Sequence, residues 1–296
     1  SIHNQSVSKD VLGIINEYIP KLNDKNIHQA VKDYLSNYSK TKQQVINNYG
    51  PISNWDVSNV TNMSRMFSYD TFFNQPLNNW NVSNVCNMKR MFGRAYNFNQ
   101  PLNNWNVSNV KTMEGMFNNT LKFNQPLNNW NVSNVTDMSC MFITKKFNQP
   151  LNDWNVSKVT NMTSMFNCAQ SFNQSLNNWD VSNVTTMDYM FYCAQLFNQP
   201  LNNWDVSNVT NMGAMFARAK SFNQPLNNWN VSNVRTMIGM FYNAKPFNQP
   251  LDNWNVSNIT DMSEMFCGAT LFNQSLNNWN VSCLLYTSPS PRDATL

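Results

Sequence analysis

Apolar and polar residues follow a pattern that repeats every 25 residues through most of the chain. In one copy, Trp80 and Val82 lie on either side of Asn81, which predicts a short strand with one buried face. The apolar residues that come next are Met88, Met91, Phe92 and Ala95. Their spacing of i, i+3, i+4 and i+7 predicts a short helix with one buried face. Each repeat therefore reads as strand, turn, two-turn helix and loop.

All ten Trp residues of the chain mark the repeat. They are Trp55, Trp80, Trp105, Trp130, Trp154, Trp179, Trp204, Trp229, Trp254 and Trp279. Before each expected helix stands an Asn, Thr or Asp, whose side-chain oxygen can accept a hydrogen bond from the first helical turn. The members of this column are Asn62, Asn87, Thr112, Asp137, Asn161, Thr186, Asn211, Thr236 and Asp261. We expect it to be a helix N-cap column.

One repeat cannot bury its Trp, Phe and Met side chains alone, but stacked repeats can. The sequence therefore predicts an α/β solenoid over residues 51–282, a leucine-rich-repeat-like curved array of short strands and short helices. Stacked strands lie ~4.8 Å apart, whereas the axes of packed helices need about 8–10 Å. We expect this difference to bend the array, with strands inside the curve and helices outside.

Asn recurs in several columns of the repeat. Asn side chains of successive repeats can form hydrogen bonds to each other and to the backbone of turns. This structural role explains the columns without a catalytic or binding function. Asp56, Asp180 and Asp205 replace Asn in one column, which indicates a shared hydrogen-bond acceptor role. The alternative is that Asn79, Asn81 and their equivalents form a polar binding strip.

The stretches "WDVSNVTNMSRMF" and "FNQPLNNW" resemble the repeats of the BspA-like leucine-rich-repeat surface proteins, which are also named from mycoplasma lipoproteins. The resemblance covers residues 51–282. It implies a curved leucine-rich-repeat fold and a role in attachment or protein binding at the cell surface. It brings no catalytic residues to this chain.

Residues 1–50 follow a different pattern and predict an all-α segment. Val11, Leu12 and Ile15 share one face of a first helix. The apolar face of a second helix is formed by Ile27, Ala30, Val31, Tyr34, Leu35 and Tyr38. These faces need a partner to cover them.

A third helix is expected after a capping box formed by Thr41 and Gln44. One interpretation of the N-terminal segment is a cap that shields the apolar end of the array, as repeat proteins need. The other is that "SVSKDVLGIINEYIPK" resembles the start of an F-box, a helical module that docks a ubiquitin-ligase adaptor. In that case Val11, Leu12 and Ile15 dock the adaptor, and the protein is intracellular.

After Ser282 the repeat stops, and "CLLYTSPSPRDATL" stands where the next repeat should continue. A back-translation of residues 283–293 resembles a common transposase-adapter sequence from DNA library preparation. We therefore interpret residues 283–296 as sequencing-adapter read-through, in which Cys283 has no biological role. We expect the natural end of the gene to be missing.

Composition argues against several classes of function. The net charge of +4 is dispersed without a basic stripe, so nucleic acid is not an expected partner. No run of ~18 apolar residues is present, so no membrane span is expected. His3 and His28 are the only histidines and lie outside the array, which leaves no material for His-based catalysis or metal binding. We expect no cofactor, no metal site and no enzymatic activity.

The sulfur-containing residues fit a structural role. Met recurs at core spacing beside Phe, which favours soft core filler over a copper site. Cys168 and Cys193 share a column in adjacent repeats. Helices ~8–10 Å apart would keep them beyond the ~7 Å that a disulfide allows between Cα atoms. We therefore expect free thiols, which weakly favours a reducing compartment.

A unique partner can be recognised only by a surface that is not itself repetitive. Columns on the expected strand side hardly vary, whereas two columns on the helix side do. The candidate partner-binding residues in these columns are Ser64, Lys89, Glu114, Asp188, Ile238, Ser68, Ile143, Tyr192 and Tyr242. The alternative is that these positions are merely exposed and free to vary. Two functions remain: an adhesion scaffold that binds a protein, or an intracellular F-box-like adaptor that selects a target.

Overall fold

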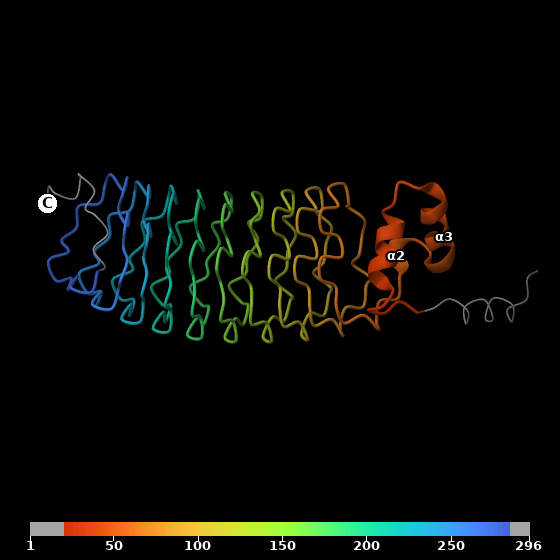
Figure 1. Ribbon diagram of the computed structural model, residues 1–296, viewed down its shortest axis with the longest axis horizontal. Helices are drawn as coiled ribbons and strands as arrows, with labels where there is room; N and C mark the ends of the chain where they lie inside the picture. Colours follow the sequence, from red (N-terminus) through yellow and green to blue (C-terminus); the bar gives the residue numbers. More distant parts are fainter. Residues whose placement is uncertain (1–20, 285–296) are drawn as a thin grey trace, which may run out of the picture.

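The computed structural model describes residues 21–284. Its elements in chain order are α2 (Ile27–Tyr34), α3 (Ser39–Tyr49) and a short 3-10 helix, η1 (Ile52–Asn54). α2 and α3 lie at one end of an elongated row of stacked turns of chain (Figure 1). Each of these turns is one repeat, and we call it a rung.

The prediction of an α/β solenoid with a leucine-rich-repeat-like array is wrong. Between residues 55 and 284 the chain forms neither an α-helix nor a strand. Apart from a bridge of Asn59 to Asn23 in the N-terminal segment, the β-type contacts in this part are isolated parallel bridges between single residues of neighbouring rungs. They connect, in order, Asn62, Asn87, Thr112, Asp137, Asn161, Thr186, Asn211, Thr236 and Asp261. The rungs are therefore built from tight turns and irregular chain.

The strand expected at residues 80–82 does not form because turns interrupt it. The side-chain Oδ1 of Asn81 accepts the N–H of Ser83 at 3.2 Å. The N–H of Val85 donates to the carbonyl of Val82 at 2.9 Å. Groups that a strand would offer to its neighbour are thus used within the same rung, and no ladder can propagate.

The helix expected in each repeat is replaced by turns whose hydrogen bonds partly leave the rung. The N–H of Met141 donates to the carbonyl of Met138, three residues back, at 3.2 Å. The N–H of Phe142 instead donates to the carbonyl of Met165 in the next rung at 2.8 Å. In an α-helix both would bond to carbonyls four residues back.

Left-handed residues recur in these segments and prevent a continuous helix. Cys140 has a φ of 57°, and Arg65 and Tyr189 have 56° and 58° at the equivalent position. This conformation costs a non-Gly residue about 1–2 kcal/mol. Hydrogen bonds between rungs, which contribute ~0.5–1.5 kcal/mol each, offset that cost. Consecutive three-residue turns return every third or fourth residue to the same side, so the apolar spacing did not distinguish them from a helix.

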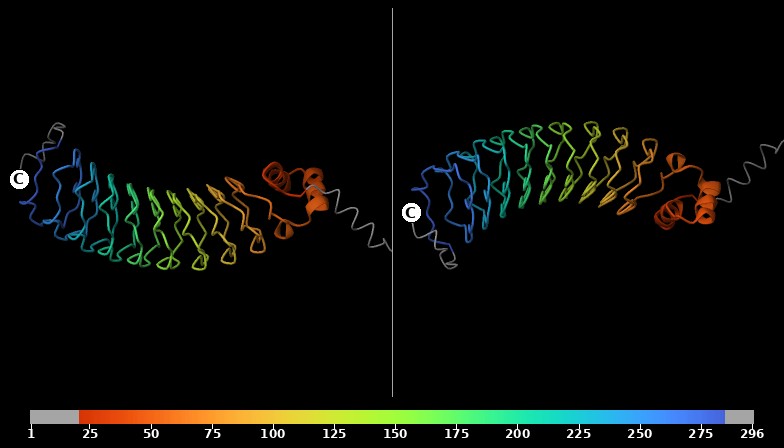
Figure 2. Two further views of the ribbon diagram at one scale, coloured as in Figure 1. Left: turned by 90° about the horizontal axis from the view of Figure 1, so that it is seen from below. Right: turned by 90° about the horizontal axis from the view of Figure 1, so that it is seen from above.

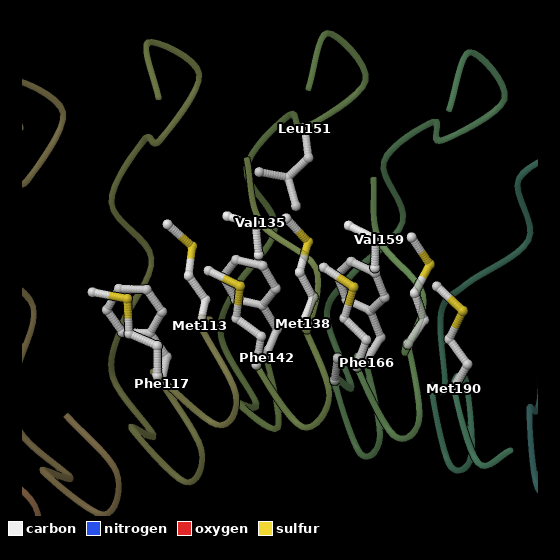
Figure 3. Packing of buried hydrophobic residues seen from close by; sticks show 14 of the residues in the cluster. Met113, Phe117, Val135, Met138, Phe142, Leu151, Val159, Phe166 and Met190 are labelled. Atoms are coloured by element: carbon white, nitrogen blue, oxygen red, sulfur yellow. The ribbon is translucent and has the colours of Figure 1, made fainter. Parts of the chain in front are cut away.

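The Trp, Phe and Met columns form one continuous core along the row. The rings of Phe117 and Phe142 stack with centroids 5.9 Å apart, and those of Trp105 and Trp130 with centroids 6.4 Å apart. Met138 is fully buried beside them, as the core-filler interpretation predicted (Figure 3). The Trp and Phe columns repeat at nearly the same spacing. The row is gently curved (Figure 2). The prediction of strands inside the curve and helices outside it is wrong, because the rungs contain neither element.

Columns of Asn side chains link the rungs, as the structural interpretation predicted. The Oδ1 of Asn99 accepts the N–H of Asn124 at 2.9 Å and the Nε2 amide of Gln125 at 3.2 Å. The Nδ2 amide of Asn109 donates to the carbonyl of Ser83 at 2.7 Å. These amides satisfy backbone groups that have no ladder partner.

The column in which Asp replaces Asn also acts as predicted. Asp56 accepts the N–H of Ser58 at 3.0 Å, and Asp205 accepts the N–H of Ser207 at the same distance. Hydrogen bonds from Ser58 lower the pKa of Asp56, and burial opposes them only partly. The column therefore closes an Asx turn in each rung.

The column predicted to cap helices closes turns instead. The Oδ1 of Asp137 accepts the N–H of Ser139 at 2.9 Å. Thr186 departs from this pattern, because its hydroxyl donates to the Oδ1 of Asp188 at 2.5 Å. The buried hydroxyl of Thr236 has no partner among the described residues. The acceptor role therefore holds at some positions of the column and not at all of them.

Replacing Asp137 by Ala is expected to lower the free energy of unfolding by ~1 kcal/mol, as for other lost caps. The N–H of Ser139 then loses its acceptor, and its amide should exchange faster with solvent. Denaturant unfolding and amide hydrogen exchange measure the two effects. Asp137→Asn keeps the acceptor oxygen and should leave both values almost unchanged, whereas an equal loss in both variants would contradict this role.

α2 and α3 cover the first rung with aromatic contacts. The rings of Tyr34 and Tyr49 have centroids 5.5 and 5.8 Å from the ring of Trp55. Ile27 and Val31 are buried on the same side of α2. The second predicted helix is thus confirmed for residues 27–34, and the part of its predicted face at Ile27, Ala30 and Val31 is buried. Tyr38 lies beyond the end of α2 and is 80% exposed, so its predicted place on this face is wrong.

Asp24 takes the place that a preceding rung would have. Within the array, the N–H of Cys86 donates to the carbonyl of Thr61 in the rung before it at 2.8 Å. Thr61 itself donates its N–H to the Oδ1 of Asp24 at 2.8 Å, and Asn62 donates to the same oxygen at 3.0 Å. Burial opposes ionisation of Asp24, but these hydrogen bonds outweigh it and lower the pKa. The Nε2 of His28 similarly lies 3.0 Å from the carbonyl oxygen of Ser64.

The remaining expectations for the two ends of the chain concern the third helix, the first helix and the assigned residue ranges. α3 begins at Ser39, and its N-cap residue Tyr38 makes no side-chain cap hydrogen bond, so the capping box predicted at Thr41 and Gln44 is wrong. The first predicted helix lies outside the described residues, as does the chain from residue 285 onward. The assignments of residues 1–50, 51–282 and 283–296 stay predictions.

Candidate partner-binding surface

The two variable columns lie on the turn segment that carries the Met and Phe core residues. One column directly follows the first Met of each rung and contains Ser64, Lys89, Glu114, Asp188 and Ile238. The other follows that Met by five residues and contains Ser68, Ile143, Tyr192 and Tyr242. Ile238 is exposed and the others are half-buried. Their side chains therefore reach the surface, although most are also partly packed.

In the first rungs these side chains bond to each other or to backbone. Lys89 forms an ion pair with Glu114, whose carboxylate also lies 3.4 Å from Arg90. The hydroxyl of Ser68 donates to the carbonyl of Gly93 at 3.1 Å. These contacts link neighbouring rungs and leave few free polar groups at this end of the columns.

Asp188 is also held by its neighbours. Its Oδ1 accepts the hydroxyls of Thr163 at 2.8 Å and Thr186 at 2.5 Å. Both donors lie in the same turn region of this rung and the preceding one. Asp188 therefore contributes more to the linkage between rungs than to a free negative surface.

The later rungs present a cluster of aromatic and cationic side chains. The guanidinium carbon of Arg218 lies 5.9 Å from the ring centroid of Tyr192 and 5.8 Å from that of Tyr242. The ring of Tyr189, which is 44% exposed, lies 5.7 Å from the ring of Tyr192. Exposed Ile238 belongs to the same rung as Tyr242. Thus three of the predicted residues fall in one region of the surface.

The sequence analysis missed Arg218 and Tyr189. Both occupy left-handed positions, with φ of 57° and 58°. On a helix Arg218 would not have been expected to reach the Tyr side chains of neighbouring repeats. Tyr189 and Tyr192, which are three residues apart in one rung, would be neighbours on a helix as well. A usable signal was present, because Tyr192 and Tyr242 share a column two repeats apart, with the small Ala217 between them.

Burial raises the pKa of the Tyr192 phenol, and the neighbouring Cys193 thiol acts in the same direction. The positive charge of Arg218 opposes this rise without cancelling it. Tyr192 therefore stays a neutral phenol at physiological pH. Its neutral ring therefore leaves the positive charge of Arg218 in place.

Part of the Asn strip proposed as an alternative site, the Asn81 column, is occupied by structural hydrogen bonds. A shallow hollow of about 510 Å³ lies beside Trp105, Asn103 and Asn129. The Oδ1 of Asn103, however, accepts the N–H of Asn129 at 3.1 Å, and the Nε1 of Trp105 donates to the carbonyl of Leu77 at 2.9 Å. The Oδ1 of Asn81 is similarly used by Ser83. These contacts favour the structural interpretation of the Asn columns.

Among residues 21–284, no group of three or more His, Cys, Asp or Glu side chains is arranged to hold a metal ion. None of the helices in this range is long and apolar enough to cross a membrane. The Met side chains of the inner rungs are buried against Phe rings (Figure 3).

Cys168 and Cys193 are free thiols, as predicted, but the reason given for this prediction is wrong. The N–H of Cys168 donates to the carbonyl of Tyr192, the residue before Cys193, at 2.7 Å. The two rungs are therefore hydrogen-bonded here and much closer than packed helices would be. Burial and the nearby Cys193 thiol raise the pKa of the Cys168 thiol.

Alkylation with iodoacetamide at pH 7.5 is expected to modify Cys86 before Cys168 and Cys140. Cys86 is exposed, whereas burial raises the pKa of the other two thiols and lowers their thiolate fraction. The difference should shrink as the pH rises through their raised pKa values. A mass-spectrometric time course without reductant measures the order. Uniform labelling rates, or a Cys168–Cys193 disulfide, would contradict the structure.

Comparison with known families gives one match. The family described as "Mycoplasma protein of unknown function, DUF285" matches residues 32–146, 129–224 and 200–288. Together these three matches span most of the chain. The chain belongs to this family. No curated protein and no solved structure matches it. The DUF285 match establishes a repeat family, and it adds nothing on the resemblance to BspA-like surface proteins.

Proposed function

We propose that this chain is a non-enzymatic protein-binding scaffold of the adhesion type, comparable to BspA-like proteins at the cell surface. The observation that carries the proposal is the contrast between an almost invariant core and exposed positions that differ from rung to rung. Tyr192 and Tyr242 reach the surface beside Arg218, and Ile238 is exposed in the same rung as Tyr242, whereas the Trp and Phe columns hardly change. Tyr and Arg are residues that often dominate binding energy at protein interfaces.

The DUF285 membership supports a repeat protein without supporting any particular ligand. The ion pairs and hydroxyl contacts of the first rungs support a structural role for that part of the columns. The proposed partner surface is therefore concentrated in the later rungs. An intracellular adaptor role would depend on Val11, Leu12 and Ile15, which lie outside the described residues.

The proposal is tested with a variant whose surface is made repetitive. Ile143, Tyr192, Ile238 and Tyr242 are replaced by Ser, which already occurs in both columns. Binding of the labelled native chain to a panel of animal cell surfaces, measured by flow cytometry, should fall about tenfold or more in the variant. The expected thermal unfolding is similar, because these side chains are not fully buried.

A matched control changes a different exposed column of the rungs. Asn81, Asn106 and Asn131 are replaced by Asp, which the same column carries at Asp56 and Asp205. Cell binding should remain unchanged in this control. If the native chain binds no surface in the panel, or both variants lose binding equally, the adhesion proposal fails.

A further inference from the structure

The guanidinium of Arg218 lies between the rings of Tyr192 and Tyr242, and we call these three residues the Tyr–Arg cluster. The two tyrosines share a column two rungs apart, and the intervening residue is the small, buried Ala217. The next residue, Arg218, is exposed, and its guanidinium lies between the two rings at 5.9 and 5.8 Å from their centroids.

Arg218 is held in place before any ligand binds. Its N–H donates to the carbonyl of Tyr242 at 2.7 Å, and two aromatic rings restrain its side chain through cation–π contacts. A restrained guanidinium loses less conformational freedom when it binds an anion than a free side chain would. The Tyr–Arg cluster is therefore preorganised for a negatively charged, planar group.

The positive charge of Arg218 is not compensated by an ion pair within the described part of the chain. In residues 21–284 the ion pairs are those of Glu114 with Lys89 and Arg90, far from Arg218 in sequence and in the row. Exposed Lys220 follows Arg218 by two residues, and exposed Lys245 occupies the same position as Lys220 in the next rung. This region is therefore locally basic although the chain as a whole is only weakly so.

Apolar side chains lie near the same rungs. Leu196 is 55% exposed and follows Tyr192 by four residues, and Ile238 is 44% exposed and precedes Tyr242 by four. An anion alone would not need these contacts. A peptide that places an acidic side chain beside apolar ones would use both the cation and the apolar positions.

We propose that Tyr192, Arg218 and Tyr242 form a docking site for an acidic peptide segment of a protein partner. A carboxylate of the segment binds the Arg218 guanidinium, which matches the two oxygens of that group geometrically. Apolar residues of the same segment contact Leu196 and Ile238. This inference rests on the proposed protein-binding function and specifies the chemistry of the partner.

The experiment selects ligands for the full chain from a phage library of random twelve-residue peptides. The selected peptides should be enriched in Asp or Glu next to Leu, Ile or Phe. A fluorescein-labelled selected peptide should then bind Arg218→Gln about tenfold more weakly than the native chain in fluorescence anisotropy, because one charge-assisted contact is lost. Changing the acidic residues of the peptide to their amides should weaken binding to a similar extent.

Arg94→Gln is the matched control. Arg94 occupies the same column as Arg218, and its guanidinium carbon lies 5.0 Å from the ring centroid of Tyr69. The positions that correspond to Tyr192 and Tyr242 are, however, Ser68 and Asn118, so the pair of tyrosines is missing around Arg94. Peptide binding to Arg94→Gln should equal binding to the native chain. Equal losses in both variants would show a general charge effect and would overturn the site.

Four further outcomes are decisive. Selected peptides without acidic enrichment, or acidic peptides whose binding survives Arg218→Gln, would overturn the site while leaving protein binding elsewhere on the surface intact. Displacement of the peptide by single-stranded oligodeoxythymidine at equal concentration would show a nucleic-acid site instead. Failure of the repetitive-surface variant to reduce cell binding would refute the proposed function independently of this result.

Discussion

Replacing Phe142 by Ala is expected to lower the free energy of unfolding by roughly 3–5 kcal/mol, as for other large-to-small core substitutions. Phe142 is fully buried in the middle of the row, and its ring centroid lies 4.2 Å from that of Phe147 and 5.6 Å from that of Phe166. Denaturant unfolding followed by Trp fluorescence measures the loss. Since each rung contacts only its neighbours, the same unfolding curve also tests whether the two halves of the array unfold separately.

Phe72→Ala provides the control for this substitution. Phe72 is 88% exposed, so its removal takes almost no apolar surface out of the core. Its effect on the free energy of unfolding should stay within ~0.5 kcal/mol. A loss at Phe142 as small as that at Phe72 would mean that the stacked Phe columns do not hold the rungs together.

Deleting residues 1–50 is expected to lower Tm by on the order of 10 °C and to cause aggregation. Trp55 loses its contacts with Tyr34 and Tyr49, and the N–H groups of Thr61 and Asn62 lose the Asp24 carboxylate. The apolar face of the first rung then becomes exposed to water. Differential scanning calorimetry and light scattering measure the two effects. Unchanged Tm and solubility would show that the segment does not stabilise the array.

A triple substitution in the full chain separates the cap from the F-box-like interpretation. Val11, Leu12 and Ile15 are changed together to Asp, and binding to a Skp-type adaptor is measured by pull-down. If the segment acts only as a cap, neither the native chain nor the variant binds the adaptor. Adaptor binding that is present in the native chain and absent from the variant would replace the adhesion proposal with the adaptor role.

The repeat and its core could be read from the sequence, because they depend on which side chains are buried. The Trp, Phe and Met columns are buried where the period placed them, and Asn99 and Asp56 form the predicted kinds of hydrogen bond. The backbone conformation could not be read in the same way. Spacing of i, i+3, i+4 and i+7 fits both a helix and consecutive tight turns, and only the left-handed φ of residues such as Cys140 separates the two.

The candidate surface was predicted only in part for the same reason. Tyr192, Ile238 and Tyr242 were found because they vary at positions that a helix would also expose. Arg218 was missed because its position between two tyrosines follows from hydrogen bonds between rungs, including that from its own N–H to the carbonyl of Tyr242. Contacts between repeats depend on the backbone path, which periodicity alone does not determine.

The central claim is that the Met–Phe segments are held by hydrogen bonds between rungs and not by helices within them. Scalar couplings measured by NMR across hydrogen bonds test this directly on the deuterated chain. The amide nitrogen of Phe142 should couple to the carbonyl carbon of Met165, and that of Cys140 to the carbonyl carbon of Thr163, because these pairs are joined at 2.8 Å. Coupling of Phe142 to the carbonyl carbon of Met138, four residues back, would instead show an α-helix and contradict the account.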